Sequence, residues 1–461
     1  MLRHLGLVAT LAVAVTGVFA QGGRPRTPVD FKTLYQFTAA DGSGGYDSNL
    51  LSDRNGGFFG TTEQGGDTDC SSLGCGTVYH LTPPPSPGGA WTKTMLYSFT
   101  GYPNDGLNPS GPLALALSGT LYGVTTGGGN GPCTYGGPSP LGCGTVYSLT
   151  PPAEPGGAWT ETVLYNFTGG SDGNYPATVT LGPDDVLYGV TSLGAGSGCF
   201  EYQGCGAAFS LSPPAVSGEA WTLNVLYAVE GFFFSGGANS LIVGPNQVLY
   251  GTTGAGTDPC EMNPCGTVFS LTPPATPGGA WTQAVLHGFT GWPNDGNSPN
   301  QSLALGPSGE LYGTTYLGGA GHPCGKDHIG CGTVFELTPP ASPGGDWTET
   351  ILFSFPAGSA PRAPAFGVVI GKDGVLYGST RYGGVPGCQD DYGCGAVFAL
   401  TPPASPNGAW AETILHPFTG GSNGAGPFMI PAIGKDGALY GTTSGYGGES
   451  GNGTVFVIKS P

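Results

Sequence analysis

The chain has few charged residues and very few basic ones. Of its 461 residues only 9% are charged, and 12 Lys and Arg stand against 30 Asp and Glu, a formal net charge of −18. Loss of a leader that contains Arg3 makes the net charge −19. A polyanion is repelled by nucleic acid and by anionic membrane surfaces, so neither is expected as a partner. Neutral glycans, cations and basic proteins remain.

Long apolar runs are missing after residue 20. The first twenty residues combine Arg3, an apolar run from Leu5 to Val15 and a small residue at Ala20, the three parts of a secretory signal. The run is too short to span a bilayer, and no later stretch approaches eighteen apolar residues. We therefore expect a signal peptide over 1–20, a short linker over 21–28 and a secreted or periplasmic product without membrane insertion.

Glycine and proline are abundant instead, at 89 and 43 residues. Such a bias can indicate disorder. However, 11% aromatic and 38% hydrophobic residues provide ample apolar surface to bury, which argues against a disordered chain. Turn-dense β structure is consistent with both facts.

One unit of 62 to 66 residues recurs seven times. Each copy contains LYxFT, then LYGTT, then GTVF, in constant order and with small variations. The LYGTT phrase is centred on Phe59, Tyr122, Tyr188, Tyr250, Tyr312, Tyr377 and Tyr440. Three markers in constant order predict seven structurally equivalent repeats.

Each unit has the pattern of four short strands, A to D in chain order. In the second copy the pattern predicts strands over 112–117, 121–126, 145–150 and 159–168. Four strands in each of seven units predict an all-β, seven-bladed β-propeller over 29–461, which we expect to be a monomer. The first strand, 31–38, has the D pattern and the last, 454–459, has the C pattern. The N-terminal strand should therefore complete the last blade and close the ring.

A tryptophan opens six of the seven D strands, and we place Phe31 at that position in the closing strand. The six are Trp91, Trp159, Trp221, Trp281, Trp347 and Trp410. One tryptophan per blade at a fixed register favours packing against the neighbouring blade over a role as a stacking platform for a ligand.

All twelve cysteines fall in B-to-C loops. They form six local pairs: Cys70 with Cys75, Cys133 with Cys143, Cys199 with Cys205, Cys260 with Cys265, Cys324 with Cys331, and Cys388 with Cys394. In an exported chain this even count predicts one disulfide in each of six blades. Zinc is the alternative in one loop, where His322 and His328 accompany the two cysteines. Disulfides are favoured because five other units have the cysteines without histidines.

The D-to-A and B-to-C loops should emerge on one face, which holds the longer loops and is the expected binding face. Candidate ligand-binding aspartates on the D-to-A loops are Asp41, Asp105, Asp172 and Asp295. They could hold Ca²⁺, but an Asp-Gly turn is the favoured explanation, and no cofactor is expected. Candidate aromatic residues are Tyr102 and Trp292, in TGYPNDG and TGWPNDG, and Phe233. They suit a sugar ring or a partner's apolar side chain, or they cap the central channel.

The sequence contains no nucleophile-elbow pattern, and its few histidines are scattered. Acidic pairs for glycoside hydrolysis could still come from different blades, where spacing along the chain does not reveal them. We therefore expect a module that binds a glycan or an extracellular protein, without catalysis. The alternatives are a carbohydrate-active hydrolase or lyase with acids at the channel mouth, and a structural envelope or matrix protein.

The concatenated unit closely resembles the GloVer tandem repeat of exported bacterial proteins. The resemblance rests on LYxFT, DGxxP, GxLYGTTxxGG, CGTVFxLTPP and GGxWTET, and it covers Phe31 to Lys459. It implies an extracellular repeat protein and specifies no activity.

Overall fold

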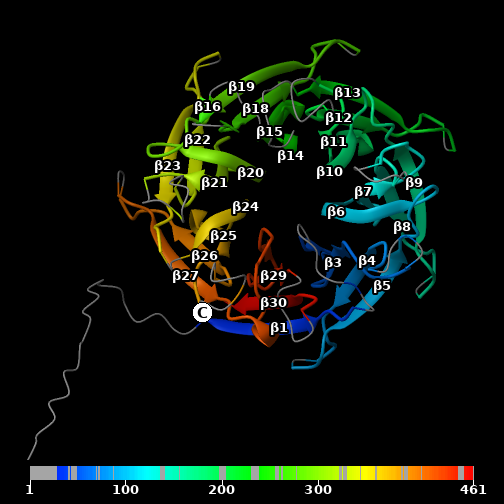
Figure 1. The fold of residues 1–461 in the computed structure, drawn as a ribbon, viewed down its shortest axis with the longest axis horizontal. Helices are drawn as coiled ribbons and strands as arrows, with labels where there is room; N and C mark the ends of the chain where they lie inside the picture. Colours follow the sequence, from blue (N-terminus) through cyan, green and yellow to red (C-terminus); the bar gives the residue numbers. More distant parts are fainter. Residues whose placement is uncertain are drawn as a thin grey trace, which may run out of the picture.

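The computed structural model describes residues 29–39, 42, 49–68, 70, 73–86, 88–134, 141–154, 156–196, 204–216, 218–229, 238–254, 259–260, 263–276, 278–320, 324, 330–342, 344–358, 361–385, 388, 393–405, 408–444 and 451–459. Seven four-stranded antiparallel sheets stand around a central axis, each forming one blade (Figure 1). The expected all-β, seven-bladed propeller is confirmed. Within the described part, no helix is long and apolar enough to cross a membrane. The expected signal peptide and linker lie outside the described residues.

The strands of blades 1 to 3 follow chain order from the axis outward. Blade 1 has β2 (Leu51–Ser52), β3 (Phe58–Thr62), β4 (Thr77–Thr82) and β5 (Thr92–Ser98). Blade 2 has β6 (Gly106–Leu115), β7 (Leu121–Gly128), β8 (Thr145–Thr150) and β9 (Thr160–Asn166). Blade 3 has β10 (Asn174–Leu181), β11 (Leu187–Leu193), β12 (Ala207–Ser212) and β13 (Thr222–Ala228).

Blades 4 to 6 repeat this order. Blade 4 has β14 (Ala238–Val243), β15 (Leu249–Thr253), β18 (Thr267–Thr272) and β19 (Thr282–Gly288), with a small ribbon of β16 (Pro259–Cys260) and β17 (Asn263–Pro264) in its B-to-C loop. Blade 5 has β20 (Gly296–Leu305), β21 (Leu311–Gly318), β22 (Thr333–Thr338) and β23 (Thr348–Ser354). Blade 6 has β24 (Arg362–Ile370), β25 (Leu376–Tyr382), β26 (Ala396–Thr401) and β27 (Ala411–Pro417). Single 3₁₀ turns occur at Pro183–Asp185, Pro245–Gln247, Lys372–Gly374 and Gly421–Asn423.

Blade 7 is built from both ends of the described chain. Its strands are β28 (Ala432–Ile433), β29 (Leu439–Thr443), β30 (Thr454–Lys459) and β1 (Asp30–Gln36). The outermost strand, β1, pairs antiparallel with β30, and Figure 1 shows the two side by side in blue and red. The expected ring closure by the N-terminal strand is confirmed, although the strand ends at Gln36, two residues earlier than expected.

One prediction about β1 is wrong. Phe31 pairs with Ile458 as Glu161 pairs with Leu149 in blade 2, so Phe31 occupies the register of Glu161 and not that of the tryptophans. The cause lies in the sequence, because Phe31 precedes the LYxFT motif by two residues fewer than Trp159 does. The ring of Phe31 stacks on His416 of blade 6, with centroids 3.6 Å apart.

The A strand of the second unit also differs from expectation, since β6 begins at Gly106 and not at Pro112. Prolines at positions 109 and 112 fit this innermost strand, because it has a neighbour on one side only and needs few backbone donors. A register shift between Ser110 and Ala114 accommodates them. The strand ends before Leu117, whose side chain is 92% exposed in the A-to-B turn.

Aromatic contacts join each blade to the next. Trp159 of blade 2 lies against Phe59 of blade 1 with centroids 5.9 Å apart, and Trp221 lies against Tyr122 at 6.0 Å. Two further tryptophan pairs have the same arrangement, Trp281–Tyr188 and Trp347–Tyr250. The phenylalanine that follows a D strand also contacts the next blade, as in Phe99–Tyr147 and Phe289–Phe335. The expected packing role of the D-strand tryptophans is confirmed, and the core lies between the blades.

Candidate functional site

The D-to-A and B-to-C loops lie together on one face of the ring. Backbone hydrogen bonds join them: Gly129 N–H, in a B-to-C loop, donates to the carbonyl of Asp105, in a D-to-A loop, at 2.7 Å. The same contact recurs between Gly319 and Asp295 at 2.8 Å. This loop face carries most of the residues that the sequence analysis selected.

Disulfides close the B-to-C loops of the loop face. Four of the expected pairs are bonded: Cys70–Cys75, Cys133–Cys143, Cys324–Cys331 and Cys388–Cys394. Cys205 and Cys265 are also disulfide-bonded, while Cys199 and the side chain of Cys260 lie outside the described residues. The bond between Cys324 and Cys331 removes the thiolates that a zinc site in this loop needs. His322 and His328 lie outside the described part.

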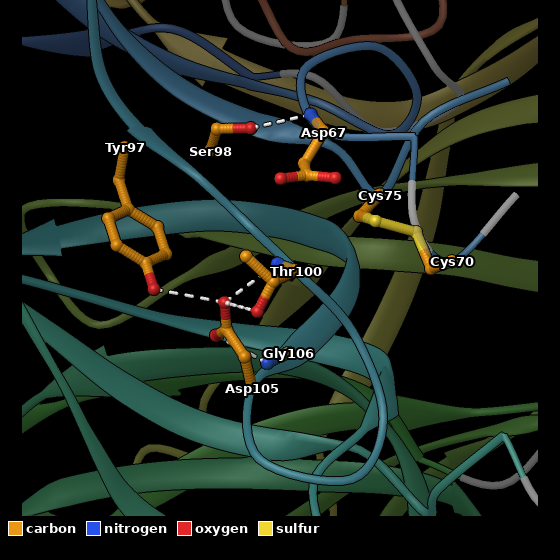
Figure 2. Close-up of a disulfide and its surroundings, with 8 residues drawn as sticks. All are labelled: Asp67, Cys70, Cys75, Tyr97, Ser98, Thr100, Asp105 and Gly106. Carbon is orange, nitrogen blue, oxygen red and sulfur yellow. Dashed lines mark hydrogen bonds between the residues drawn. A yellow bond between two sulfur atoms is a disulfide. The ribbon is translucent and has the colours of Figure 1, made fainter.

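Asp105 holds the D-to-A loop between blades 1 and 2 in shape. Figure 2 shows its carboxylate receiving hydrogen bonds from the Thr100 N–H at 2.7 Å, the Gly106 N–H at 2.6 Å and the Tyr97 hydroxyl at 2.9 Å. The Cys70–Cys75 disulfide lies beside this loop (Figure 2). Local sequence explains the arrangement, because Asp is a preferred turn residue whose short side chain reaches nearby backbone N–H groups.

Two other candidate aspartates have the same role. Asp295 receives the Thr290 N–H at 2.7 Å and the Gly296 N–H at 2.5 Å, and Asp172 receives the Thr168 N–H at 2.8 Å. The three aspartates are only 5–8% exposed. This geometry supports the turn interpretation over a calcium site, and direct contact with a ligand stays a prediction. Asp41 lies outside the described residues.

The candidate aromatic residues differ sharply from these aspartates in exposure. Tyr102 is 39% exposed and Trp292 is 43% exposed, each on the loop that a buried aspartate holds. The two loops leave β5 and β19, which lie in separate sectors of the ring (Figure 1), so the structure does not bring the two rings together. Phe233 lies outside the described residues.

Sequence analysis missed a cavity of about 200 Å³ on the axis. It is lined by uncharged residues from six blades: Asn49, Leu50, Pro112, Thr178, Ser240, Ser302, Ile430, Pro431 and Ala432. A signal for it was present, because Thr178, Ser240 and Ser302 recur at spacings of 62 residues. Small hydroxyl side chains at one A-strand position of three consecutive units indicate hydroxyl groups on the channel wall.

Buried carboxyl groups between blades were also missed. Glu161, on β9, lies near Asp105, and its Oε1 atom is buried without a hydrogen-bond partner. Burial and the charge of Asp105 raise the pKa of Glu161 to about 7. Glu349 and Glu412 occupy the same position in blades 5 and 6, where burial again raises each pKa to about 7. The sequence signal was a glutamate two residues after the D-strand tryptophan, which Glu161, Glu349 and Glu412 share.

The sequence matches the model of the Gloeobacter/Verrucomicrobia repeat over residues 24–202 and 74–325. This chain belongs to that repeat family. The match agrees with the resemblance carried by the motifs and covers more than half of the chain. No curated protein matches the sequence significantly.

Several solved structures are similar to this chain at low identity. A fungal alcohol oxidase in complex with copper is 13% identical, with a TM-score of 0.53, over 95% of this chain and 77% of the oxidase. PorZ, a surface component of the type-IX secretion system of Porphyromonas gingivalis, is 12% identical, with a TM-score of 0.49, over 92% of this chain and 48% of PorZ. An ulvan lyase is 10% identical, with a TM-score of 0.47, over 82% of this chain and 86% of the lyase. These likenesses concern the fold alone.

Proposed function

We propose that this chain is an exported binding module whose loop face recognises a neutral glycan. The observation that carries the proposal is the exposure of Tyr102 and Trp292 at equivalent positions of two loops. An aromatic face in solvent gains free energy when a sugar ring or another apolar surface covers it. A basic extracellular protein is the other partner class that the charge of the chain allows.

The two loops are built to hold these rings in place. Within the first loop, the Gly101 N–H donates to the Gly106 carbonyl at 3.0 Å, and the Asp105 N–H donates to the Gly101 carbonyl at 3.0 Å. The loop of Trp292 repeats both bonds. A ligand that binds to a rigid loop does not have to order it first, so less of the binding free energy is lost. Rings held on hydrogen-bonded loops are therefore consistent with a binding surface.

Charge favours a neutral ligand over an acidic polysaccharide. The chain carries a net charge of −18, and the cavity on the axis is lined only by uncharged side chains. Approach of a polyanionic glycan to such a surface is disfavoured. A neutral glycan meets hydroxyl and amide groups that can exchange hydrogen bonds with it.

A carbohydrate-active hydrolase is the second candidate, and one observation favours it. Asp105 and Glu161 come from adjacent blades, and a glutamic acid with a pKa of about 7 can act as a general acid. Against this role, Oε1 of Glu161 is buried between the blades, and neither the axial cavity nor the shallow pocket near Gly169 includes it. Asp105 likewise does not line the axial cavity.

The experiment that separates the candidates uses the secreted chain. Neutral hexasaccharides of β-1,4-linked glucose, xylose and mannose are arrayed with acidic polysaccharides, and the bound sugars are then incubated and analysed by chromatography for products. The proposal expects binding to a neutral glycan without products. Products that disappear in Glu161→Gln would establish the hydrolase, and no binding to any arrayed glycan would refute the glycan proposal. N-terminal sequencing should find Gln21 first if the signal peptide is cleaved as expected.

A further inference from the structure

The gap between blades 4 and 5 contains three potential metal ligands. His287 lies on β19, Asp295 on the following loop, and Glu349 on β23 of the next blade. The His287 Nε2 atom is 3.3 Å from Asp295 Oδ2 and 3.8 Å from Glu349 Oε2. One ligand atom from each residue lies within 4.8 Å of the other two. Three separate elements therefore converge on one point.

Repetition shows what is special about this gap. Between blades 1 and 2 the equivalent residues are Tyr97, Asp105 and Glu161, so a tyrosine takes the place of the histidine. Burial and the charge of Asp105 raise the pKa of Tyr97, so its hydroxyl stays protonated and donates a hydrogen bond to Asp105 at 2.9 Å. A neutral phenol is a poor metal ligand, whereas imidazole is the commonest one in proteins.

The gap contains two nearly buried carboxyl groups that a cation could bind. Asp295 and Glu349 are 9% and 14% exposed at their side chains, and Oε1 of Glu349 is buried without a hydrogen-bond partner. A divalent cation would neutralise both carboxylates at once.

The donor set and the spacing identify the ion. A tetrahedral ion with bonds of about 2.0–2.1 Å to nitrogen and oxygen sets its ligand atoms roughly 3.4 Å apart. The distances of 3.3 and 3.8 Å from His287 Nε2 are close to this value. Calcium and magnesium prefer oxygen ligands, whereas one of the three donors in this gap is an imidazole nitrogen. His nitrogen and Asp or Glu oxygen are all zinc ligands, and a site with three protein ligands leaves a fourth position for water.

We propose that His287, Asp295 and Glu349 bind one Zn²⁺ ion between blades 4 and 5, independently of the glycan proposal. Coordination uses the neutral imidazole, so Nε2 releases its proton to solvent when the ion binds. The ion would join the outermost strands of two neighbouring blades. This site is distinct from the loop of residues 322–331, whose two described sulfur atoms are bonded to each other.

The fold supplies a matched control at another gap. His416 of blade 6 is equivalent to His287, but its Nε2 atom faces Asn423 Oδ1 at 3.3 Å, and Phe31 stands where blade 5 has Glu349. This gap therefore has the imidazole without the carboxylates. His416→Tyr removes a histidine from an equivalent place and should leave zinc binding unchanged.

The test measures zinc alone on the secreted chain after treatment with a chelator and dialysis. Isothermal titration with zinc chloride and metal analysis after gel filtration should give one ion per chain. His287→Tyr, which copies the gap between blades 1 and 2, should weaken binding at least tenfold, and Glu349→Gln should do the same if the first variant folds poorly. In addition, Co²⁺ should give the visible spectrum of a tetrahedral site in the wild type and in His416→Tyr only. Absence of stoichiometric zinc from the wild type, or equal zinc binding by the His287 and Glu349 variants, would overturn the proposal.

Discussion

The gap between blades 1 and 2 and the gap between blades 4 and 5 have loops of the same shape and differ in one half-buried residue of the D strand. In both gaps an aspartate receives the same threonine and glycine N–H groups and holds an aromatic ring in solvent. The D strand contributes Tyr97 to the first gap and His287 to the second. The loop shape is therefore set by Asp, Thr and Gly, while the chemistry of the gap is set by a single strand residue.

The gap between blades 6 and 7 shows what the carboxylates add. Burial lowers the pKa of His416, which faces Asn423 and stacks on Phe31. The pKa of His287 is raised in spite of similar burial, because Asp295 and Glu349 face it. The pKa of an imidazole at one strand position is thus raised in one gap and lowered in the other, and the residues that face it set the direction.

Deletion of the closing strand should open the ring and disrupt the packing of the blades on which both gaps depend. We expect this change to cause the largest loss of unfolding free energy. Deletion of residues 30–36 takes away β1, with the partly buried side chains of Phe31, Leu34 and Tyr35. Their loss alone should cost about 5 kcal/mol of unfolding free energy. Thermal unfolding followed by circular dichroism checks this, with a chain that starts at Val29 as the control. A truncated chain that melts like the control would contradict the role of β1.

Removing the loop aspartates should come next. Asp105→Ala strands the Thr100 and Gly106 N–H groups and the Tyr97 hydroxyl, at a cost of about 3 kcal/mol measured by denaturant unfolding. Asp295→Ala should lower the free energy of unfolding more at pH 5 than at pH 8, because His287 is protonated at pH 5 and loses its charged partner.

Asn substitutions provide the control for these variants. Asn423 already receives the Thr419 N–H at 2.9 Å between blades 6 and 7, so Asp105→Asn should cost less than half as much as Asp105→Ala. Equal costs for the two Asp105 variants would mean that hydrogen bonding does not hold the loop.

The buried glutamates give a smaller, pH-dependent effect. The folded pKa of Glu161 is about 7, above its ordinary value of 4.5, so its contribution to stability is complete below pH 4.5 and is lost as the pH rises through 7. Glu161→Gln should therefore stabilise the protein at pH 8 by about 1 kcal/mol, a value discounted for partial contact with water, and not at pH 4. Urea unfolding at several pH values measures this.

Glu349→Gln separates the two gaps. At pH 6 the gain in unfolding free energy should be smaller for Glu349→Gln than for Glu161→Gln, because protonated His287 favours the ionised form of Glu349. Glu161 has no imidazole beside it in its gap, where the equivalent residue is Tyr97. Identical pH profiles for the two variants would show that His287 and Glu349 do not interact.

Much of the fold could be predicted from the sequence, because the same motifs occur in seven copies and each copy shows the same order of strands. The motif order places strands B to D closely, as Thr145–Thr150 shows, and the orphan strands at the two ends of the chain predict the closure. The start of β6 was missed because proline is tolerated in a strand that has a single neighbour.

The gap chemistry could not be read from the sequence. Asp105 and Glu161 lie 56 positions apart, and Asp295 and Glu349 lie 54 apart, on elements that meet only when two blades pack. Spacing along the chain carries no information about such pairs. The exposure of Tyr102 and Trp292 was predictable only in part, since an aromatic beside a turn can also pack on the channel.

The binding role of these two aromatic rings is the central claim, and one titration tests it most directly. The neutral glycan bound most tightly by the wild type is titrated into Tyr102→Ala, Trp292→Ala and the double variant, with Leu117→Ala, on the opposite face, as the control. The double variant should weaken binding at least tenfold and each single variant less, because the rings lie on separate loops, and all unfolding free energies should stay within about 0.5 kcal/mol of the wild type because the rings are exposed. Unchanged affinity in the double variant would contradict the account.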